Sequence, residues 1–72
     1  MSAEPKQRAV EVGAACAWTA VDEQAHYPSL EAAIEHWHQT MIATLADLEL
    51  ERFQAERAFR KTLRLHGIRH KP

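Results

Sequence analysis

Cysteine is almost absent from this chain, because Cys16 is the only one among its 72 residues. A single cysteine can form no disulfide within the chain and cannot supply a zinc site built from paired cysteines. Domains this short bury only about 60% of the surface of the unfolded chain, so they often need such a cross-link or a partner. A lone thiol is also typical of a reducing compartment, which predicts a cytoplasmic protein.

Long hydrophobic runs are missing as well. No stretch approaches the roughly 18 apolar residues that a membrane span needs. Residues 9–21, AVEVGAACAWTAV, look like the core of a signal peptide, but they are rich in alanine and contain Glu11. We therefore expect neither a membrane protein nor a secreted one.

Proline and glycine are scarce, with three and two residues respectively. Two of the three prolines lie near the termini, so Pro28 is almost the only residue in the interior of the chain that favours a turn. The residue before a proline avoids helical backbone angles, which ends the preceding element at Tyr27. Ser29 is a typical N-cap, and Glu31 follows in the first turn, where the helix dipole favours an acid. The sequence therefore predicts a turn at residues 26–29.

Residues 6–25, before this turn, have the pattern of a helix that Gly13 weakens. Apolar side chains recur at helical spacing on one face, with Trp18 at its edge: Val10, Ala14, Ala17, Val21 and Ala25. Most of them are small, so a second helix could approach this face closely. The valine and threonine content leaves a strand at AVEVG as the alternative.

The strongest pattern in the chain follows the turn. Apolar and amphipathic side chains recur at spacings of three and four residues from Leu30 to His66, with no glycine or proline before Gly67. Gly67 stands where a C-cap glycine belongs, and basic side chains fill the last turns, as the helix dipole prefers. We predict one helix over residues 29–66, about 57 Å long. The alternative is a break near Asp47, which could cap a third helix.

The two predicted helices differ in length, and this difference predicts that the chain associates with a second copy. A first helix of about 20 residues spans roughly 30 Å, so it covers the second helix only as far as Leu48. Four large apolar side chains then lack a partner within the chain: Phe53, Phe59, Leu63 and Leu65. Leaving each of them exposed would cost roughly 1.5–3 kcal/mol. We expect an all-α helical hairpin with a long second helix, completed as a bundle by dimerisation.

Charge is divided unevenly along the chain, although the net charge is only −1. Residues 1–56 hold ten acids and three bases, whereas residues 57–72, which include a basic tail over residues 67–72, hold six bases and no acid. Clustered bases with Phe59 and Leu63 between them suit phosphate binding, so nucleic acid is one candidate partner. The acidic remainder would repel DNA, and we favour instead the acidic body of a neighbouring chain.

The partner-binding surface is predicted on the later part of the long helix. It comprises these apolar and basic side chains: Phe53, Arg57, Phe59, Arg60, Leu63 and Arg64. The hairpin itself would be held by three core anchors: Trp37, Leu45 and Leu48. The expected partner is a second copy of the chain, a regulatory protein, or both.

Candidate metal ligands are few. Trp37 stands between His36 and His38, and the two histidines point to opposite sides of a helix, so they cannot share a metal ion. Glu31, Glu35 and His38 form a weaker candidate. Glu35 and His38 have the spacing that di-iron helical bundles use, but such sites need two copies of the motif and only one is present. We therefore expect no metal and no other cofactor.

No catalytic arrangement is visible either. Cys16 lies among alanines and has the features of a small buried thiol, and no glycine-rich phosphate loop is present. We therefore expect an interaction module and not an enzyme. A small accessory subunit of a larger enzyme or nucleoprotein complex is the alternative, and a dimeric metal-binding bundle is a further one.

From Tyr27 to Arg57 the pattern resembles the AraC negative regulator family and the related PerC-type proteins of bacteria. The shared features are an aromatic at a turn, paired alanines, a tryptophan and a later aromatic-x-x-x-arginine: Tyr27, Ala32, Ala33, Trp37, Phe53 and Arg57. The chain departs from the pattern at His26, where the family has a glycine, at Phe53, where it has a tryptophan, and after Arg57, where bases replace a cysteine. The resemblance implies a helical regulator that acts through contacts with transcription factors or nucleoid proteins.

Overall fold

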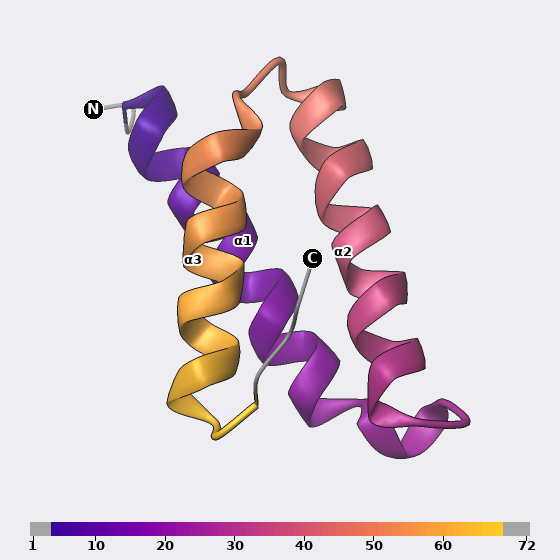
Figure 1. Cartoon of the computed structure of the whole chain (residues 1–72). Helices are drawn as coiled ribbons and strands as arrows, with labels where there is room; N and C mark the ends of the chain where they lie inside the picture. Colours follow the sequence, from indigo (N-terminus) through magenta and orange to yellow (C-terminus); the bar gives the residue numbers. More distant parts are fainter. Residues whose placement is uncertain (1–3, 69–72) are drawn as a thin grey trace.

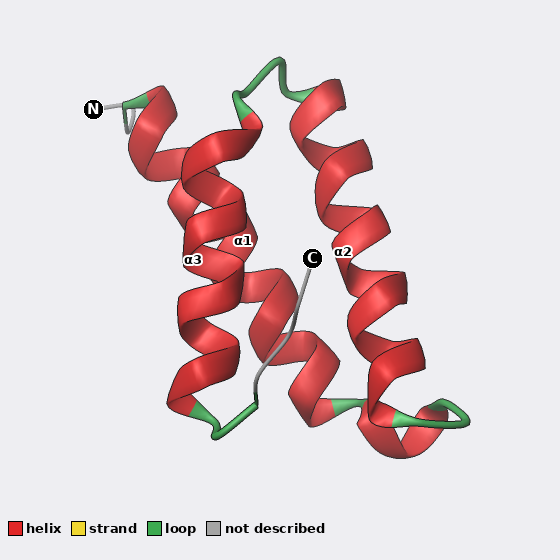
Figure 2. Ribbon diagram, viewed as in Figure 1, coloured by secondary structure: helices red, strands yellow, loops and turns green. Residues whose placement is uncertain are grey.

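In a computed structural model, which describes residues 4–68, the chain folds into three α-helices joined by short turns (Figures 1 and 2). The elements are α1 (Pro5–Asp22), the 3-10 turn η1 (Gln24–His26), α2 (Leu30–Asp47) and α3 (Arg52–Leu65). The described residues contain no strand, so the alternative of a strand at AVEVG is wrong. The predicted all-α class is confirmed.

The turn between α1 and α2 includes the predicted residues 26–29, but α1 ends at Asp22, three residues before the predicted end at residue 25. Tyr27 adopts an extended backbone, with φ of −123° and ψ of 157°, immediately before Pro28. The Ser29 hydroxyl oxygen then accepts a hydrogen bond of 3.1 Å from the Ala32 N–H and so caps the start of α2. This cap satisfies one of the backbone donors that every helix leaves free at its start.

The continuous helix predicted over residues 29–66 is wrong. The chain leaves the helix after Asp47, reverses its direction within four residues and continues as α3 beside α1 (Figure 1). The structure therefore shows the alternative, a break near Asp47, although the N-cap of α3 is Glu51 and not Asp47. The fold is a three-helix bundle in place of a hairpin with an overhanging end.

A Schellman motif makes this reversal, because N–H groups beyond the end of α2 bond back to its last carbonyl groups. The Leu50 N–H donates to the Leu45 carbonyl at 2.8 Å, and the Glu49 N–H donates to the Ala46 carbonyl at 3.1 Å. Glu49 adopts the left-handed conformation that the motif requires, with φ of 56°. Leu50 then packs against the core, which fixes the direction in which the chain leaves.

The end of α3 repeats the same motif with a glycine in the left-handed place. Gly67 has φ of 76°, and its N–H donates to the Arg64 carbonyl at 2.9 Å. The Ile68 N–H donates to the Leu63 carbonyl at 3.0 Å, and Ile68 packs against the core. Gly67 thus serves as the C-cap glycine that the sequence indicates.

α1 is the central helix of the bundle, since it packs against both other helices while α2 and α3 contact each other little. The large buried side chains come from α2 and α3: Ile34, Met41, Leu45, Phe59 and Leu63. α1 contributes only small buried residues: Ala9, Gly13, Cys16, Ala17 and Ala20. The core therefore sets bulky side chains of two helices against a small-residue face of the third.

This small-residue face is rotated from the predicted one, and Gly13 gives the reason. A Cβ atom added at Gly13 would collide with the backbone carbonyl of Ala55 in α3. The two helices therefore touch backbone to backbone where they cross, and Val10 and Ala14 are left at the flank, half-buried. Gly13 weakens α1 locally but permits the close approach of α3.

The core is complete within one chain. Phe59 is only 1% exposed and Leu63 is fully buried, because α1 and α2 cover the face that α3 presents. The radius of gyration is 11.8 Å, close to the roughly 11 Å of a compact chain of this length. Phe59 and Leu63 therefore need no second copy to cover them, and their predicted exposure is wrong because it assumed a long helix that does not form. Phe53 and Leu65, the other two side chains predicted to lack a partner within the chain, are exposed.

Candidate functional site

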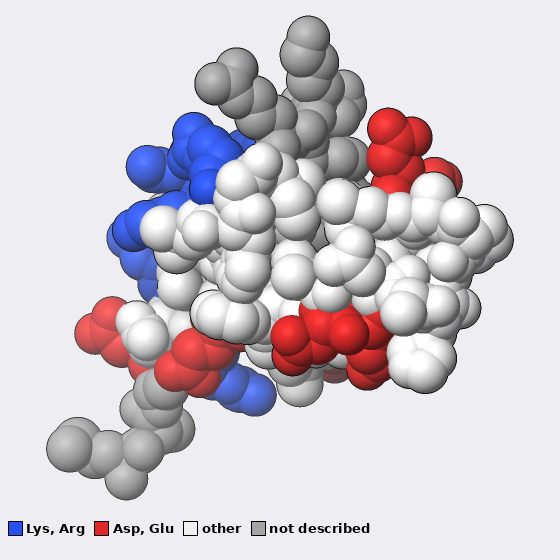
Figure 3. Space-filling view, turned by 90° about the horizontal axis from the view of Figure 1, so that it is seen from below, with Lys and Arg blue, Asp and Glu red and all other residues white. Residues whose placement is uncertain are grey.

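The side of α3 that points away from the core carries aromatic and basic side chains, and we call it the α3 outer face: Phe53, Arg57, Arg60, Lys61 and Arg64. The helical repeat of 3.6 residues places them opposite the core positions of α3. Phe53 is 64% exposed, and the Arg57 guanidinium lies 5.7 Å from the centre of its ring, within the range of a cation–π contact. Figure 3 shows Lys and Arg side chains gathered along one side of the visible face.

The structure divides the predicted interface residues into two groups. Four of them lie on the α3 outer face: Phe53, Arg57, Arg60 and Arg64. Phe59 and Leu63 are buried inside the chain, so their assignment to a partner interface is wrong. They lie on the opposite side of α3. This side faces the core because the chain reverses its direction between α2 and α3.

A shallow pocket of about 270 Å³ borders the α3 outer face where α1 lies against α3. Val10 of α1 lines it together with five residues of α3: Gln54, Arg57, Ala58, Lys61 and Arg64. Trp18 of α1 is 51% exposed, and the sequence analysis missed it as a surface residue. Its place at the edge of the apolar face of residues 6–25 is the signal that could have found it.

A second hollow, of about 400 Å³, lies between the start of α1 and the turn from α2 to α3. Its lining mixes Glu4, Glu49 and Glu51 with Lys6 and apolar residues. Three carboxylates around one small space repel one another, which disfavours an acidic ligand. No other feature of the described residues points to a ligand there.

Glu31, Glu35 and His38 do not assemble into a metal site. Glu31 and Glu35 are exposed on α2, whereas the His38 Nε2 atom lies 2.9 Å from Glu56 Oε1 in α3. Within residues 4–68, no group of three or more His, Cys, Asp or Glu side chains is placed to hold a metal ion. His38 therefore serves a contact between helices.

The pair of His38 and Glu56 links two helices that otherwise contact each other little. The hydrogen bond with His38 is the main cause that lowers the pKa of Glu56, while partial burial acts in the opposite direction and the charge of Arg52 lowers it further. The Arg52 Nη2 atom lies 3.7 Å from the second carboxylate oxygen. His38 also stands edge-on to the Phe59 ring at 5.4 Å, so the pair closes one edge of the core.

The three predicted core anchors have different environments. Leu45 is fully buried, and Trp37 is half-buried against the core with its Nε1 atom buried and without a hydrogen-bond partner among the described residues. Leu48 is 41% exposed, so its assignment as a core anchor is wrong. It is the C-cap of α2, where the backbone leaves the helix and carries the side chain away from the core.

Cys16 is the remaining candidate for chemistry, and its environment makes the thiol inert. It is buried in the core, and burial raises the pKa of the thiol above its ordinary value. The reactive species is the thiolate, which this shift disfavours. The small buried thiol expected from the sequence is the role that the structure gives it.

No protein-family model, no curated protein and no solved structure matches this chain. Among residues 4–68, no helix combines the length and the apolar character needed to cross a membrane. The function is therefore inferred from the α3 outer face and the shallow pocket that borders it between α1 and α3.

Proposed function

We propose that this protein is a small helical interaction module that binds another protein through the α3 outer face. The observation that carries the proposal is the exposed Phe53 ring with the Arg57 guanidinium over it, on the side of α3 that the core does not use. Aromatic and arginine side chains are enriched at protein interfaces and dominate their binding energy. Burying the Phe53 ring in a partner is worth roughly 1.5–3 kcal/mol.

Charge supports a partner with an acidic surface. Among residues 4–68, Arg57, Lys61 and Arg64 form no ion pair with an acidic side chain, in contrast to Arg52, which pairs with Glu56. These cations are therefore free to meet carboxylates of another molecule, which would speed the encounter and fix its orientation. A partner other than a second copy is favoured, because one chain already covers its own core.

The resemblance to the AraC negative regulators supports a role in the regulation of transcription through protein contacts. Phe53 and Arg57 stand at the aromatic-x-x-x-arginine of that pattern, and they are the two residues in cation–π contact on the α3 outer face. Tyr27 and Trp37, which stand at two earlier positions of the pattern, flank His36 at ring distances of 5.4 and 5.3 Å. The residues at the positions of the pattern thus include the exposed pair of Phe53 and Arg57. They also include two rings, Tyr27 and Trp37, that pack with His36 at α2.

Site-specific photo-crosslinking in the natural host tests the proposal. A photoreactive phenylalanine derivative in place of Phe53 is expected to give one discrete adduct with another protein, and Arg57→Glu in the same chain is expected to abolish it. Gln39, exposed on the outer side of α2, is the matched control position and should give no such adduct. Equal crosslinking from both positions, or an adduct that Arg57→Glu leaves unchanged, would overturn the proposal.

A further inference from the structure

The pocket between α1 and α3 has a lining that selects one kind of partner surface. We call it the α1–α3 groove, and its residues are Val10, Gln54, Arg57, Ala58, Lys61 and Arg64. Half of these side chains are cations and none is acidic. We infer that the groove binds an acidic amphipathic helix of the partner, an assignment that rests on the proposed interaction function.

The spacing of the cations fits a helix lying along α3. Arg57, Lys61 and Arg64 occupy positions i, i+4 and i+7, so they form a row about 10 Å long on one side of α3. Carboxylates at the same spacing on a second helix would each meet one of these cations. Glu11, which follows Val10 on α1, lies outside the lining, and its carboxylate accepts a hydrogen bond of 3.3 Å from Gln7.

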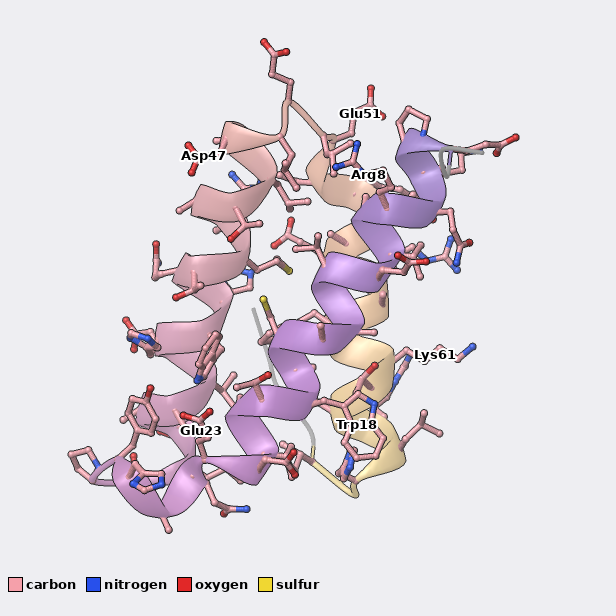
Figure 4. The ribbon with its side chains drawn as sticks, turned by 180° about the vertical axis from the view of Figure 1, so that it is seen from behind. Arg8, Trp18, Glu23, Asp47, Glu51 and Lys61 are labelled. Carbon is pink, nitrogen blue, oxygen red and sulfur yellow. The ribbon has the colours of Figure 1, made fainter. Side chains whose placement is uncertain are left out.

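Exposed apolar side chains stand at the end of α3 towards which this row of cations runs. Leu65 is 73% exposed and Trp18 is 51% exposed. The Trp18 ring stands edge-on to the His66 ring, with 4.3 Å between centres, which holds an exposed ring of α1 against the end of α3. Figure 4 shows Trp18 and Lys61 on the same side of the molecule, where α1 and α3 lie together.

The exposed Trp18 and Leu65 side chains near the end of α3 favour a helix over nucleic acid as the partner. A helix that carries acids along one edge and leucines along the next could pair the cations and cover Trp18 and Leu65 together, which is the helix-in-groove mode of recognition. A phosphate backbone would pair the cations but leave both apolar side chains in water. The acids that outnumber the bases in the described residues would also oppose its approach.

A nuclear magnetic resonance titration with a synthetic peptide tests the inference. The probe is a helical peptide of about four turns with glutamates at i, i+4 and i+7 and leucines on the adjacent stripe. The Trp18 indole N–H signal is expected to shift during the titration. The Trp37 indole, whose Nε1 atom is buried, is the internal reference and should stay in place.

Two charge reversals and a matched peptide complete the experiment. Lys61→Glu should weaken binding by roughly tenfold or more, because it sets like charges against each other in the groove. Arg8→Glu makes the same change in net charge at an exposed position that Figure 4 shows near the opposite end of the molecule, and it should leave the affinity within about twofold. A peptide with glutamine in place of each glutamate should bind as weakly as the Lys61→Glu protein does to the original.

Three results would overturn the inference. They are absence of binding to the acidic peptide, equal losses from Lys61→Glu and Arg8→Glu, and binding of duplex DNA with no shift of the Trp18 signal. The photo-crosslinking experiment separates this failure from that of the proposed function. A discrete Phe53 adduct without peptide binding removes only the acidic helix, whereas loss of the adduct removes the interaction surface itself.

Discussion

At the scale of single residues, Glu49 and Gly67 occupy equivalent places at the ends of α2 and α3. Both have a positive φ, of 56° and 76° respectively, and both are followed by an N–H that bonds back to the helix. Only Gly67 has the residue type that the place favours, since a side chain in the left-handed conformation costs roughly 1–2 kcal/mol. The sequence therefore has no glycine to mark the end of α2, whereas Gly67 marks the end of α3.

Glu49→Gly is expected to raise the free energy of unfolding by up to about 1 kcal/mol, because it removes the strain at a positive φ. Glu49→Val should lower it, since a β-branched side chain tolerates this conformation poorly. Urea denaturation measures both. Glu51→Gly is the matched control in the same turn, where φ is −75°, and it should destabilise through added chain entropy. Equal losses from the two glycine variants would contradict the assignment at Glu49.

Gly13→Ala should lower the free energy of unfolding, although alanine favours a helix over glycine by roughly 1 kcal/mol. The added methyl group would meet the Ala55 carbonyl and force α1 and α3 apart, which costs about 1–3 kcal/mol or more. Thermal unfolding followed by circular dichroism gives the sign. A more stable Gly13→Ala protein would show that the two helices do not cross so closely.

At the scale of the helices, the sequence predicts the local signals well and the long-range ones poorly. The start of α2 was predictable because Pro28 and Ser29 act within a few residues. The end of α2 near Asp47 was predicted only as the alternative, since Glu49 stands where a glycine is expected and the apolar spacing continues in phase across the turn. Because of that continuity, the sequence predicts Phe59 on the same face of one long helix as the apolar residues of α2. In the structure the chain reverses between the two helices, so the apolar faces of both α2 and α3 pack against α1.

The contact between His38 and Glu56 was also beyond sequence reasoning, because the two residues are brought together by the same reversal. Two residues 18 positions apart carry no local signal for pairing. The exposed row of Arg57, Lys61 and Arg64, in contrast, could be predicted from spacing alone. The predicted interface included three of the bases of this surface, Arg57, Arg60 and Arg64, but neither Lys61 nor Trp18 on α1.

The pairing of His38 with Glu56 predicts an acid dependence of stability. The pKa of Glu56 is lowered in the folded chain from its ordinary value of 4.5, so the stabilisation is present above pH 4.5 and is lost as pH falls through the lowered value. Glu56→Gln should flatten this part of the profile of unfolding free energy against pH. His38→Ala should do the same, and the double variant should add little further. Additive effects of the two single changes would contradict a direct pairing.

At the scale of the whole molecule, the two phenylalanines have opposite roles. Phe59→Ala should lower the free energy of unfolding by about 3–5 kcal/mol, because it leaves a cavity in the core. Phe53→Ala should change it by less than about 1 kcal/mol, since the ring is mostly in water. Chemical denaturation of the two variants provides the comparison. Similar losses from both would show that Phe53 is buried in solution, by a second copy or otherwise.

Charge also has a distribution at the scale of the whole molecule. α2 contains acids but no lysine or arginine, whereas α3 carries five bases and one acid. A nearly neutral chain thus presents a basic side and an acidic side, as Figure 3 shows in part. This polarity would orient an approaching partner before any close contact forms.

The central claim is that one chain closes its own core and leaves the α3 outer face free for a different protein. Sedimentation equilibrium over a wide dilution series, with thermal unfolding at each concentration, tests it most directly. We predict a mass of 8.2 kDa at every concentration and a midpoint of unfolding that does not change on dilution. A mass near twice that value, together with a midpoint that falls on dilution, would contradict the account.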